Sequence, residues 1–382
     1  MSSRMRAAVL VDVGRIEVRE VPLVPPGPRE VLVRPVAVGL CGTDFHIFAG
    51  HSNYNTNPRG EQVPLRQSPQ ILGHEIVAVV QECGRDVREL RSGQPVVVDQ
   101  GLNCQSAGVS LCEYCSTGDS HQCANYREHG ITGLPGGLAE FLTVPAINTI
   151  RVSSGTPRER AALTEPLGCI VHSSDLVQRA SARYHLDAAS GANRVQSVLV
   201  SGAGPAGLLF IQYLRRALKW DGRILVSEPN PVKRMLATTC GAEALDPSVD
   251  VTEAVLAATS GRRVEYLIDA SGAGALFRQI PGILRKQGTI LLYGHGHAGV
   301  DLSVLNNVQF LEPTLVSPVG ASGGFLPDGR PATYHRALEL IESGTIDVAP
   351  IVTHRYTSLD QVGSAFAGAH TQAAYVKGVV EL

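Results

Sequence analysis

The first third of the chain carries short hydrophobic runs, rich in β-branched residues, which are separated by Gly, Pro and polar turn residues. Such runs predict short strands, and several of them in succession are typical of a small antiparallel, barrel-like unit. The runs that we expect to form strands are residues 6–12, 15–21, 30–39, 75–84 and 94–101.

The pattern changes after Thr164. Residues 165–183 place apolar side chains at helical spacing, and Pro166 falls in the first turn, where its missing N–H is no loss. A polar stretch, 185–196, separates this helix from four strand patterns that alternate with helix-sized segments. This alternation predicts a parallel sheet with helical crossovers. The four strand patterns are residues 197–201, 223–229, 264–272 and 288–294.

The last segment returns to a mixed pattern, with a short helix over 335–344 and strand patterns over 348–357 and 373–382. These elements are too few to form a domain, so we expect them to complete the β-rich unit. The length of 382 residues suits two domains. The expected fold class is α/β, with a β-rich domain over 1–183 completed by 320–382 and a doubly wound sheet domain over 184–319.

Composition excludes several classes of protein. Hydrophobic residues make up 44% and charged residues 18%, the balance of a soluble globular protein. The net charge is -2 with no long basic run, which argues against nucleic acid or an anionic membrane as a partner. No apolar stretch is long enough to span a bilayer, and the first residues lack a signal-peptide pattern. We expect a cytoplasmic protein whose eight cysteines are not a disulfide framework.

The segment GAGPAG directly follows the predicted strand 197–201 and precedes an apolar helix. Its three glycines would allow a tight turn, backbone approach to a pyrophosphate, and close packing of helix on strand. The helix N-terminus would offer N–H groups to the phosphates. The turn residues that we expect to bind a dinucleotide are Gly202, Gly204, Pro205, Ala206 and Gly207.

Glu228 ends the next predicted strand. An acid at this position accepts hydrogen bonds from ribose hydroxyls and repels the 2′-phosphate of NADP, so NAD is the expected cofactor. Lys233 follows closely, and it could hold a ribose or phosphate or be a solvated lysine of the first helical turn.

Two short motifs carry zinc-ligand chemistry. CGTDFH begins with Cys41 after a predicted strand, and GHE places His74 and Glu75 before another. Thiolate, imidazole and carboxylate can bind zinc tetrahedrally while leaving one position open. A second cluster of four cysteines within twenty residues also suggests metal; its members are Cys104, Cys112, Cys115 and Cys123.

Together these features resemble the zinc-dependent medium-chain dehydrogenases of the alcohol dehydrogenase superfamily, most closely the branch of sorbitol, threonine and glucose dehydrogenases. The likeness covers nearly the whole chain, through CGTD, GHE, the cysteine cluster, GGLAEF, the EPL segment, GAGPAG and the C-terminal return. It implies a GroES-like catalytic domain, a Rossmann NAD-binding domain, catalytic and structural zinc, and a homodimer or homotetramer.

The resemblance also implies roles for single residues. Cys41 and His74 would bind the catalytic zinc. The third protein ligand would be Glu165, in TEPLGC, which we prefer, or Glu75. Asp44 would orient His74 by accepting its other N–H.

Further positions bear on proton transfer and on the pocket. Thr43 and His46 match the start and end of a proton relay that runs through the cofactor ribose. His51, His121 and His129 could face the pocket, although a histidine of this kind, taken by itself, is more often a surface or loop residue.

The cysteine cluster departs from the family pattern at one position. Its usual first ligand lies three residues before Cys112, where this chain has Val109. We interpret QSAGVSL as a loop insertion, so that Cys104 still closes a structural four-thiolate zinc site. The alternative is a degenerate lobe without metal.

Residues 51–69 make the spacing between Cys41 and His74 longer than is usual in the family. This polar segment could hydrogen-bond a polyhydroxylated substrate, or it could be a solvent loop or subunit contact. We expect an oxidoreductase that transfers hydride from a secondary alcohol of a sugar, polyol, cyclitol or amino-polyol to NAD. The alternatives are a dehydrogenase of L-threonine or another amino alcohol, and a non-catalytic NAD-binding structural or redox-sensing protein.

Overall fold

The computed structural model describes residues 4–188 and 191–382, and the chain divides into two compact units. The first unit contains the residues up to Gly168, Ala321–Gly344 and Ile351–Leu382, and the second contains Cys169–Gly320 and Thr345–Pro350. The boundary falls inside α5 (Thr164–Arg179), which ends four residues before the predicted helix end.

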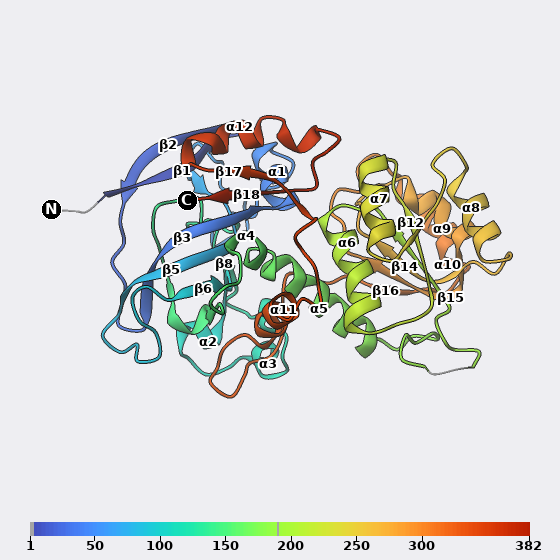
Figure 1. Ribbon diagram of the computed structural model, residues 1–382, viewed down its shortest axis with the longest axis horizontal. Helices are drawn as coiled ribbons and strands as arrows, with labels where there is room; N and C mark the ends of the chain where they lie inside the picture. The colour runs from blue at the N-terminus through green and yellow to red at the C-terminus, as the bar shows by residue number, and fades with distance from the viewer. Residues whose placement is uncertain (1–3, 189–190) are drawn as a thin grey trace. The chain divides into compact units, whose positions relative to one another are not determined.

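A seven-stranded sheet forms the centre of the first unit (Figure 1). Its strands are β3 (Glu30–Leu40), β5 (Glu75–Cys83), β6 (Pro95–Val98), β9 (Leu142–Pro145), β10 (Thr149–Arg151), β17 (Val352–Tyr356) and β18 (Lys377–Glu381). The order is β10-β6-β5-β3-β18-β17, with β9 also paired to β3. β18 pairs antiparallel with β3, so the C-terminal strands lie in the same sheet as the N-terminal ones.

Two smaller sheets belong to the same unit. They comprise β1 (Arg4–Asp12), β2 (Arg15–Pro22) and β4 (Gln70–Ile71) in one, and β7 (Gly101–Leu102) and β8 (Arg127–Glu128) in the other. The helices of this unit are α1 (Gly42–Phe48), α2 (Cys104–Ala107), α3 (Glu113–Ser116), α4 (Arg158–Ala161), α11 (Ala332–Glu342) and α12 (Val362–Phe366). The five strands predicted in the first third are confirmed as β1, β2, β3, β5 and β6.

The second unit contains a six-stranded parallel sheet, as the alternation of strands and helices predicted. Its strands are β11 (Ser197–Ser201), β12 (Arg223–Ser227), β13 (Glu243–Ala244), β14 (Val264–Asp269), β15 (Leu284–Leu292) and β16 (Thr314–Val316). The order is β13-β12-β11-β14-β15-β16. Every residue of β11 and β14 is buried, as expected for central strands covered on both faces.

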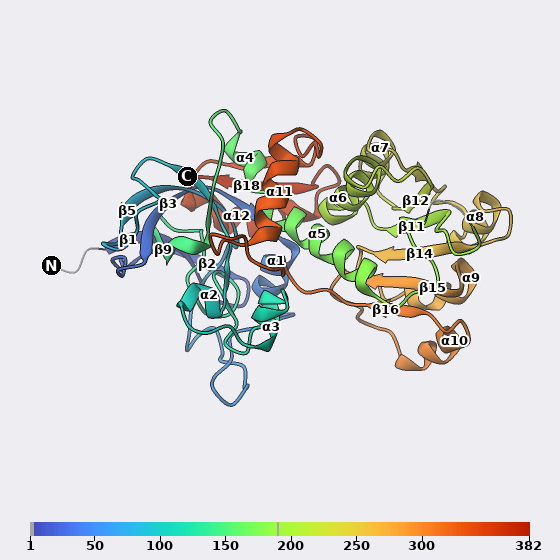
Figure 2. The ribbon, with the colours of Figure 1, turned by 90° about the horizontal axis from the view of Figure 1, so that it is seen from below.

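Helices flank this sheet in two groups (Figure 2). They are α6 (Pro205–Gln212), α7 (Pro231–Thr239), α8 (Val251–Ala258), α9 (Leu276–Ile283) and α10 (Leu305–Gln309). α6 packs against α7, whereas α8 and α10 both pack against α9. The fold is therefore α/β, with a GroES-like β-rich unit and a doubly wound Rossmann sheet.

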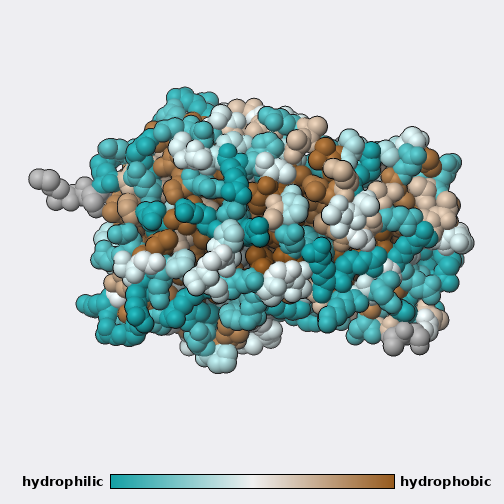
Figure 3. Space-filling view, in the orientation of Figure 1, coloured by the Kyte–Doolittle hydropathy of each residue, from teal (hydrophilic) through white to brown (hydrophobic). Residues whose placement is uncertain are grey.

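Hydrophilic residues cover much of the face shown in Figure 3. Among the described residues, no helix has both the length and the apolar character that crossing a bilayer requires.

Candidate metal and dinucleotide sites

Strand pairing in the first unit brings Cys41 to His74 and Glu75. Cys41 follows the end of β3, and Glu75 begins β5 opposite Gly39 of β3. One ligand atom from each of Cys41, His74 and Glu75 lies within 4.8 Å of the others. His74 and Glu75 are buried and Cys41 is half-buried, so the group could hold a metal ion beneath the surface.

Asp44 ties the two ligand-bearing loops together. Its Oδ2 accepts a hydrogen bond from the Cys41 N–H at 2.9 Å, and its Oδ1 accepts one from the Gly73 N–H at 3.2 Å. Oδ1 also lies 3.4 Å from His74 Nδ1. Because Asp44 is fully buried, it can set the orientation of the imidazole from behind.

Glu75 is paired with a residue from the other end of the chain. Its Oε1 accepts a buried, charge-assisted hydrogen bond from Lys377 Nζ on β18. Its Oε2 is buried without a hydrogen-bond partner and lies over Gly39, where any side chain would collide with it. The sequence analysis missed Lys377, since nothing near it in the sequence points to this contact.

The donor set fits a zinc ion. Burial disfavours a charged imidazole, yet the nearby Asp44 and Cys41 raise the pKa of His74 well above its usual value. Glu75 Oε2 is a buried acceptor without a hydrogen-bond partner, which a cation bound beside it could satisfy. Sulfur, nitrogen and oxygen donors in a group of three match zinc with one open position.

Two other predicted residues lie on α1 beside this group. The Cys41 thiol lies 3.8 Å from Thr43 Oγ1 and can donate to it. The His46 and His51 rings lie 6.0 Å apart, and the His51 N–H donates to the His46 carbonyl.

Glu165 is not a member of the three-residue group. It lies in the first turn of α5, and its Oε1 accepts a hydrogen bond from Gln100 Nε2 at 3.2 Å. Gln100 Oε1 in turn accepts one from the Tyr334 hydroxyl on α11. All three side chains are buried, so this network fixes the orientation of the Glu165 carboxylate.

Two buried histidines lie nearby in the first unit. His121 Nε2 lies 3.8 Å from Asp99 Oδ1; burial opposes a charged ring here, but Asp99 raises the pKa of His121 above its usual value. His129 Nδ1 donates to the Pro135 carbonyl at 2.8 Å, and burial lowers the pKa of His129. Its Nε2 is therefore an acceptor, buried and without a hydrogen-bond partner.

The second cysteine cluster comes together in space. Ligand atoms of Cys104, Cys112, Cys115 and Cys123 all lie within 4.8 Å of one another, and the Cys104 and Cys123 sulfurs are 3.6 Å apart. Cys104 begins α2, a one-turn helix that Asn103 caps and Gly108 ends in the left-handed conformation. This turn brings Cys104 to the other three across the unusual spacing.

The electrostatics of this cluster suit a cation. Backbone N–H groups of Cys115 and Ala124 lower the pKa of Cys112 to about 6, whereas burial raises the pKa of Cys115. Four thiols, three of them buried and that of Cys112 half-buried, are the donor set of a closed structural zinc site.

The glycine turn of the second unit has the geometry that a dinucleotide site requires. Gly202 has φ of 93°, which an L side chain rarely adopts. A Cβ on Gly207 would lie 2.0 Å from the Gly202 carbonyl oxygen, so only glycine lets α6 pack this closely. Gly204 caps α6 and has open space beside it, and Pro205 and Ala206 form the first turn.

Glu228 lies directly beside this turn. Its Oε2 accepts the Ala203 N–H at 2.8 Å, and its Oε1 accepts the Asn230 N–H at 2.8 Å. Lys233 is half-buried in the first turn of α7, where its backbone N–H donates to Asn230 Oδ1. The carboxylate is held against the glycine loop and keeps further acceptor capacity for a ribose hydroxyl.

Residues 51–69 use much of their polar chemistry internally. Asn53 donates to the Val63 carbonyl, Asn57 to Glu61, and Asn55 to Ser68. The segment forms a loop that extends from the first unit, in mid-blue in Figure 2. This arrangement favours the interpretation as a self-supporting loop over that of a substrate-binding segment.

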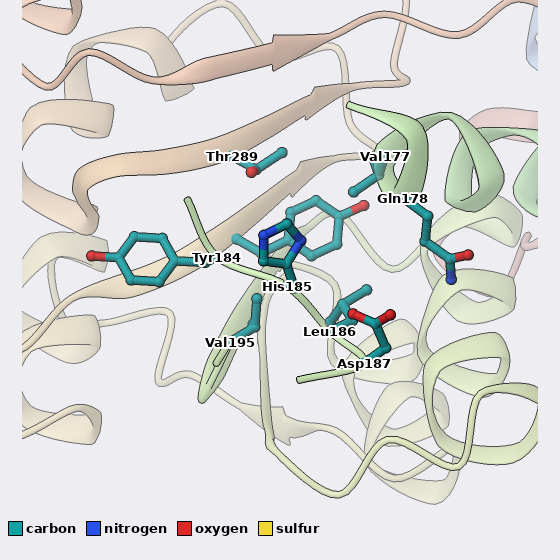
Figure 4. Close-up of a pocket in the computed structure, with 9 residues that line it drawn as sticks. Val177, Gln178, Tyr184, His185, Leu186, Asp187, Val195 and Thr289 are labelled. Atoms are coloured by element: carbon teal, nitrogen blue, oxygen red, sulfur yellow. The ribbon is translucent and has the colours of Figure 1, made fainter. Parts of the chain in front are cut away.

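A small cavity of about 50 Å³ lies in the second unit. Figure 4 shows it between the end of α5, the segment with His185, and Thr289 of β15. Thr289 Oγ1 is buried without a hydrogen-bond partner, and the volume suits one or two waters. Within the described part of the chain, its lining includes none of the predicted site residues.

Comparison with known families matches both units. Residues 27–154 match the alcohol dehydrogenase GroES-like domain, and residues 205–343 match the zinc-binding dehydrogenase family.

Relatives of known activity extend over most of the chain. The L-threonine 3-dehydrogenase of Pyrococcus furiosus is 32% identical over 352 residues, covering 92% of this chain and 90% of that protein. The L-galactonate-5-dehydrogenase of Escherichia coli is 29% identical, covering 88% and 87%.

Solved structures share the whole fold. A zinc-binding dehydrogenase from Sinorhizobium meliloti, bound to NADP, is 27% identical with a TM-score of 0.79 over 100% of both chains. Galactitol-1-phosphate dehydrogenase from Escherichia coli, at 21% identity, has a TM-score of 0.78 over 99% of this chain and 100% of that one.

Proposed function

Because this chain belongs to the zinc-dependent alcohol dehydrogenase family, in its threonine and polyol dehydrogenase branch, we propose that it oxidises a secondary hydroxyl of a polyhydroxylated substrate with NAD. The chain is a zinc-dependent NAD(P) dehydrogenase that acts on an alcohol. The substrate class proposed is a sugar, polyol, cyclitol or amino-polyol.

The open Cys41, His74 and Glu75 group carries the proposal. Zinc held there would act as a Lewis acid that eases loss of the proton from the substrate hydroxyl, while NAD accepts the hydride. Glu75 is favoured as the third ligand because it belongs to the three-residue group and its Oε2 has no hydrogen-bond partner, whereas Glu165 lies outside the group and accepts a hydrogen bond from Gln100. Asp44 would hold His74 in the tautomer that presents Nε2 to the metal.

Residues on α1 would remove the proton. Thr43 Oγ1 lies 3.8 Å from the Cys41 sulfur, and Thr43 would relay the proton: it would accept it from the substrate hydroxyl as it donates its own hydroxyl proton towards the cofactor ribose. His46, one helical turn further, would pass that proton towards solvent.

Three features support the proposed cofactor and the proposed class of substrate. Glu228 at the glycine loop favours NAD, since a carboxylate repels a 2′-phosphate. His129 Nε2 is a buried acceptor that a substrate hydroxyl could satisfy. Aromatic residues are only 5% of the chain, which gives little support for a large apolar alcohol pocket.

L-Threonine remains the second candidate because of the relatives that oxidise it. A homodimer or homotetramer stays a prediction that light scattering can test.

The test is NADH formation with sorbitol, galactitol, myo-inositol, L-galactonate and L-threonine, with zinc content measured on the same sample. We expect turnover of a polyhydroxylated compound, and higher kcat/KM with NAD than with NADP. Preference for L-threonine would reject the substrate class. Cys41→Ser and His74→Ala should remove turnover while NADH binding is retained, and undiminished activity in the metal-free protein would reject the mechanism.

A further inference from the structure

Asp269, the last residue of β14, is a fully buried carboxylate with four donors. Its Oδ1 accepts hydrogen bonds from the Ser271 N–H, the Ser271 hydroxyl and the Gly272 N–H at 2.8–3.1 Å. Its Oδ2 lies 2.6 Å from His297 Nε2. Because a carboxylate only accepts, Nε2 must carry the hydrogen.

This hydrogen bond joins the loops that follow β14 and β15. The backbone N–H groups of Tyr293 and Gly294 donate to the Asp269 carbonyl, and the His297 N–H donates to the Gly272 carbonyl at 2.7 Å. His297 has φ of 42°, a conformation uncommon for a non-glycine residue, so its surroundings hold it there. Its ring also meets Phe277 edge to face, with centroids 5.2 Å apart.

The joined loops lie at the carboxyl edge of the sheet, beside the glycine turn. The strand order reverses between β11 and β14, and ligands of open parallel sheets bind outside such a switch point. Ser201 Oγ at the end of β11 lies 3.2 Å from Ser271 Oγ, and a Cβ on Gly202 would meet Ser271.

The two halves of a dinucleotide therefore fall on opposite sides of the turn. Glu228 follows β12 and is placed for the ribose of the adenosine half. The nicotinamide half would then extend over the ends of β14 and β15, where the loops joined by His297 and Asp269 lie.

We propose that His297, through its hydrogen bond to Asp269, is a positioning residue for the nicotinamide half of the cofactor. The inference rests on the dinucleotide binding of the proposed function, and it adds residues that the glycine motif does not include. The imidazole holds the loop after β15 against the loop after β14, so the nicotinamide meets a surface already in place.

The experiment compares two ligands by calorimetry on the zinc-loaded protein: NADH, and ADP-ribose, which lacks the nicotinamide. Loss of one hydrogen bond to a buried charge should weaken NADH binding to His297→Ala by at least about tenfold. ADP-ribose binding should change by less than about twofold, because its contacts lie on the Glu228 side. His297→Gln, whose amide can donate from nearly the same place, should recover most of the NADH affinity.

His295→Ala is the matched control, since it removes an imidazole two residues earlier in the same loop. It should bind both ligands as the wild type does. Equal weakening of NADH and ADP-ribose by His297→Ala would show a general loss of structure and overturn the inference, as would unchanged NADH binding. Wild-type protein that binds neither ligand would instead overturn the dinucleotide site itself, and circular dichroism of each variant confirms that it is folded.

Discussion

Lys377 on β18 neutralises the carboxylate of Glu75, the residue next to His74, across 302 positions of sequence. Both side chains are buried. Burial alone would lower the pKa of Lys377, but Glu75 and Cys41 raise it, so the ammonium stays charged. The metal-free site thus already holds one positive charge against its carboxylate.

The first prediction concerns this ion pair. Lys377→Met leaves Glu75 buried and unpaired, so the free energy of unfolding of the metal-free protein should fall by roughly 3–5 kcal/mol. Denaturant unfolding after chelation measures it. The double variant Lys377→Met/Glu75→Gln should recover part of the lost free energy of unfolding, because it removes the unpaired carboxylate charge of Glu75. Equal unfolding midpoints for Lys377→Met and the wild type would show that the pair contributes nothing.

The second prediction separates the two candidate third ligands. Glu75→Gln should weaken cobalt or zinc binding at the catalytic site by roughly 10–100-fold, as loss of a metal-site partner does. Glu165→Gln should have a smaller effect, because Glu165 lies outside the group and bonds to Gln100. Chelator competition, followed by the visible spectrum of the cobalt form, measures both. The reverse order would restore Glu165 as the ligand.

The third prediction concerns the four-cysteine cluster. Cys112→Ser should lower the zinc content from two ions per chain to one, since the two groups of ligands are separate. Metal binding contributes to folding, so the melting temperature should fall as well. Cys83→Ser is the control, because Cys83 lies outside both groups. One zinc per chain in the wild type would instead support the alternative that the four-cysteine cluster binds no metal.

The fourth prediction is a pH dependence in the second unit. Glu265 accepts hydrogen bonds from Arg285 at 2.7 Å and from the backbone N–H groups of Gln196 and Ser197. Burial would raise the pKa of Glu265, but these donors outweigh it and lower the pKa. Because the pKa of Glu265 is lower in the folded protein than in the unfolded chain, its contribution to the free energy of unfolding is fully present above the ordinary pKa of a glutamate. It is lost as the pH falls through the lowered value.

Glu265→Gln should therefore cost roughly 3–5 kcal/mol of unfolding free energy at neutral pH, and the difference from the wild type should shrink as the pH falls. Glu243→Gln breaks an exposed pair with Arg223 and should cost under about 1 kcal/mol. Urea unfolding at several pH values measures both variants. A difference that does not vary with pH would contradict the assignment.

Local patterns predicted most of the fold. The long strands of the two large sheets follow from hydrophobic runs, and the glycine turn follows from chemistry that only glycine permits. The short strands β9, β10, β13 and β16 were not predicted. Cys104 could be assigned to its cluster despite the insertion, because buried thiols so close in sequence have few other uses.

Contacts between distant segments could not be predicted. Neither the link from Gln100 to Tyr334 nor the pair of Glu75 with Lys377 has a local signal, since each depends on which strands and helices become neighbours. The polar segment 51–69 is a case in which composition alone was misleading. Its composition suited a ligand, but its amides bond within the segment, and only the backbone path reveals that.

The position of Lys377 on β18 also sets an order of assembly during synthesis. The second unit consists largely of one continuous stretch, Cys169–Gly320, which can fold soon after it leaves the ribosome. The sheet of the first unit is complete only when β18 has been made, and Lys377 can pair with Glu75 only from that point. Glu75 is therefore the last residue of the metal group to gain its partner.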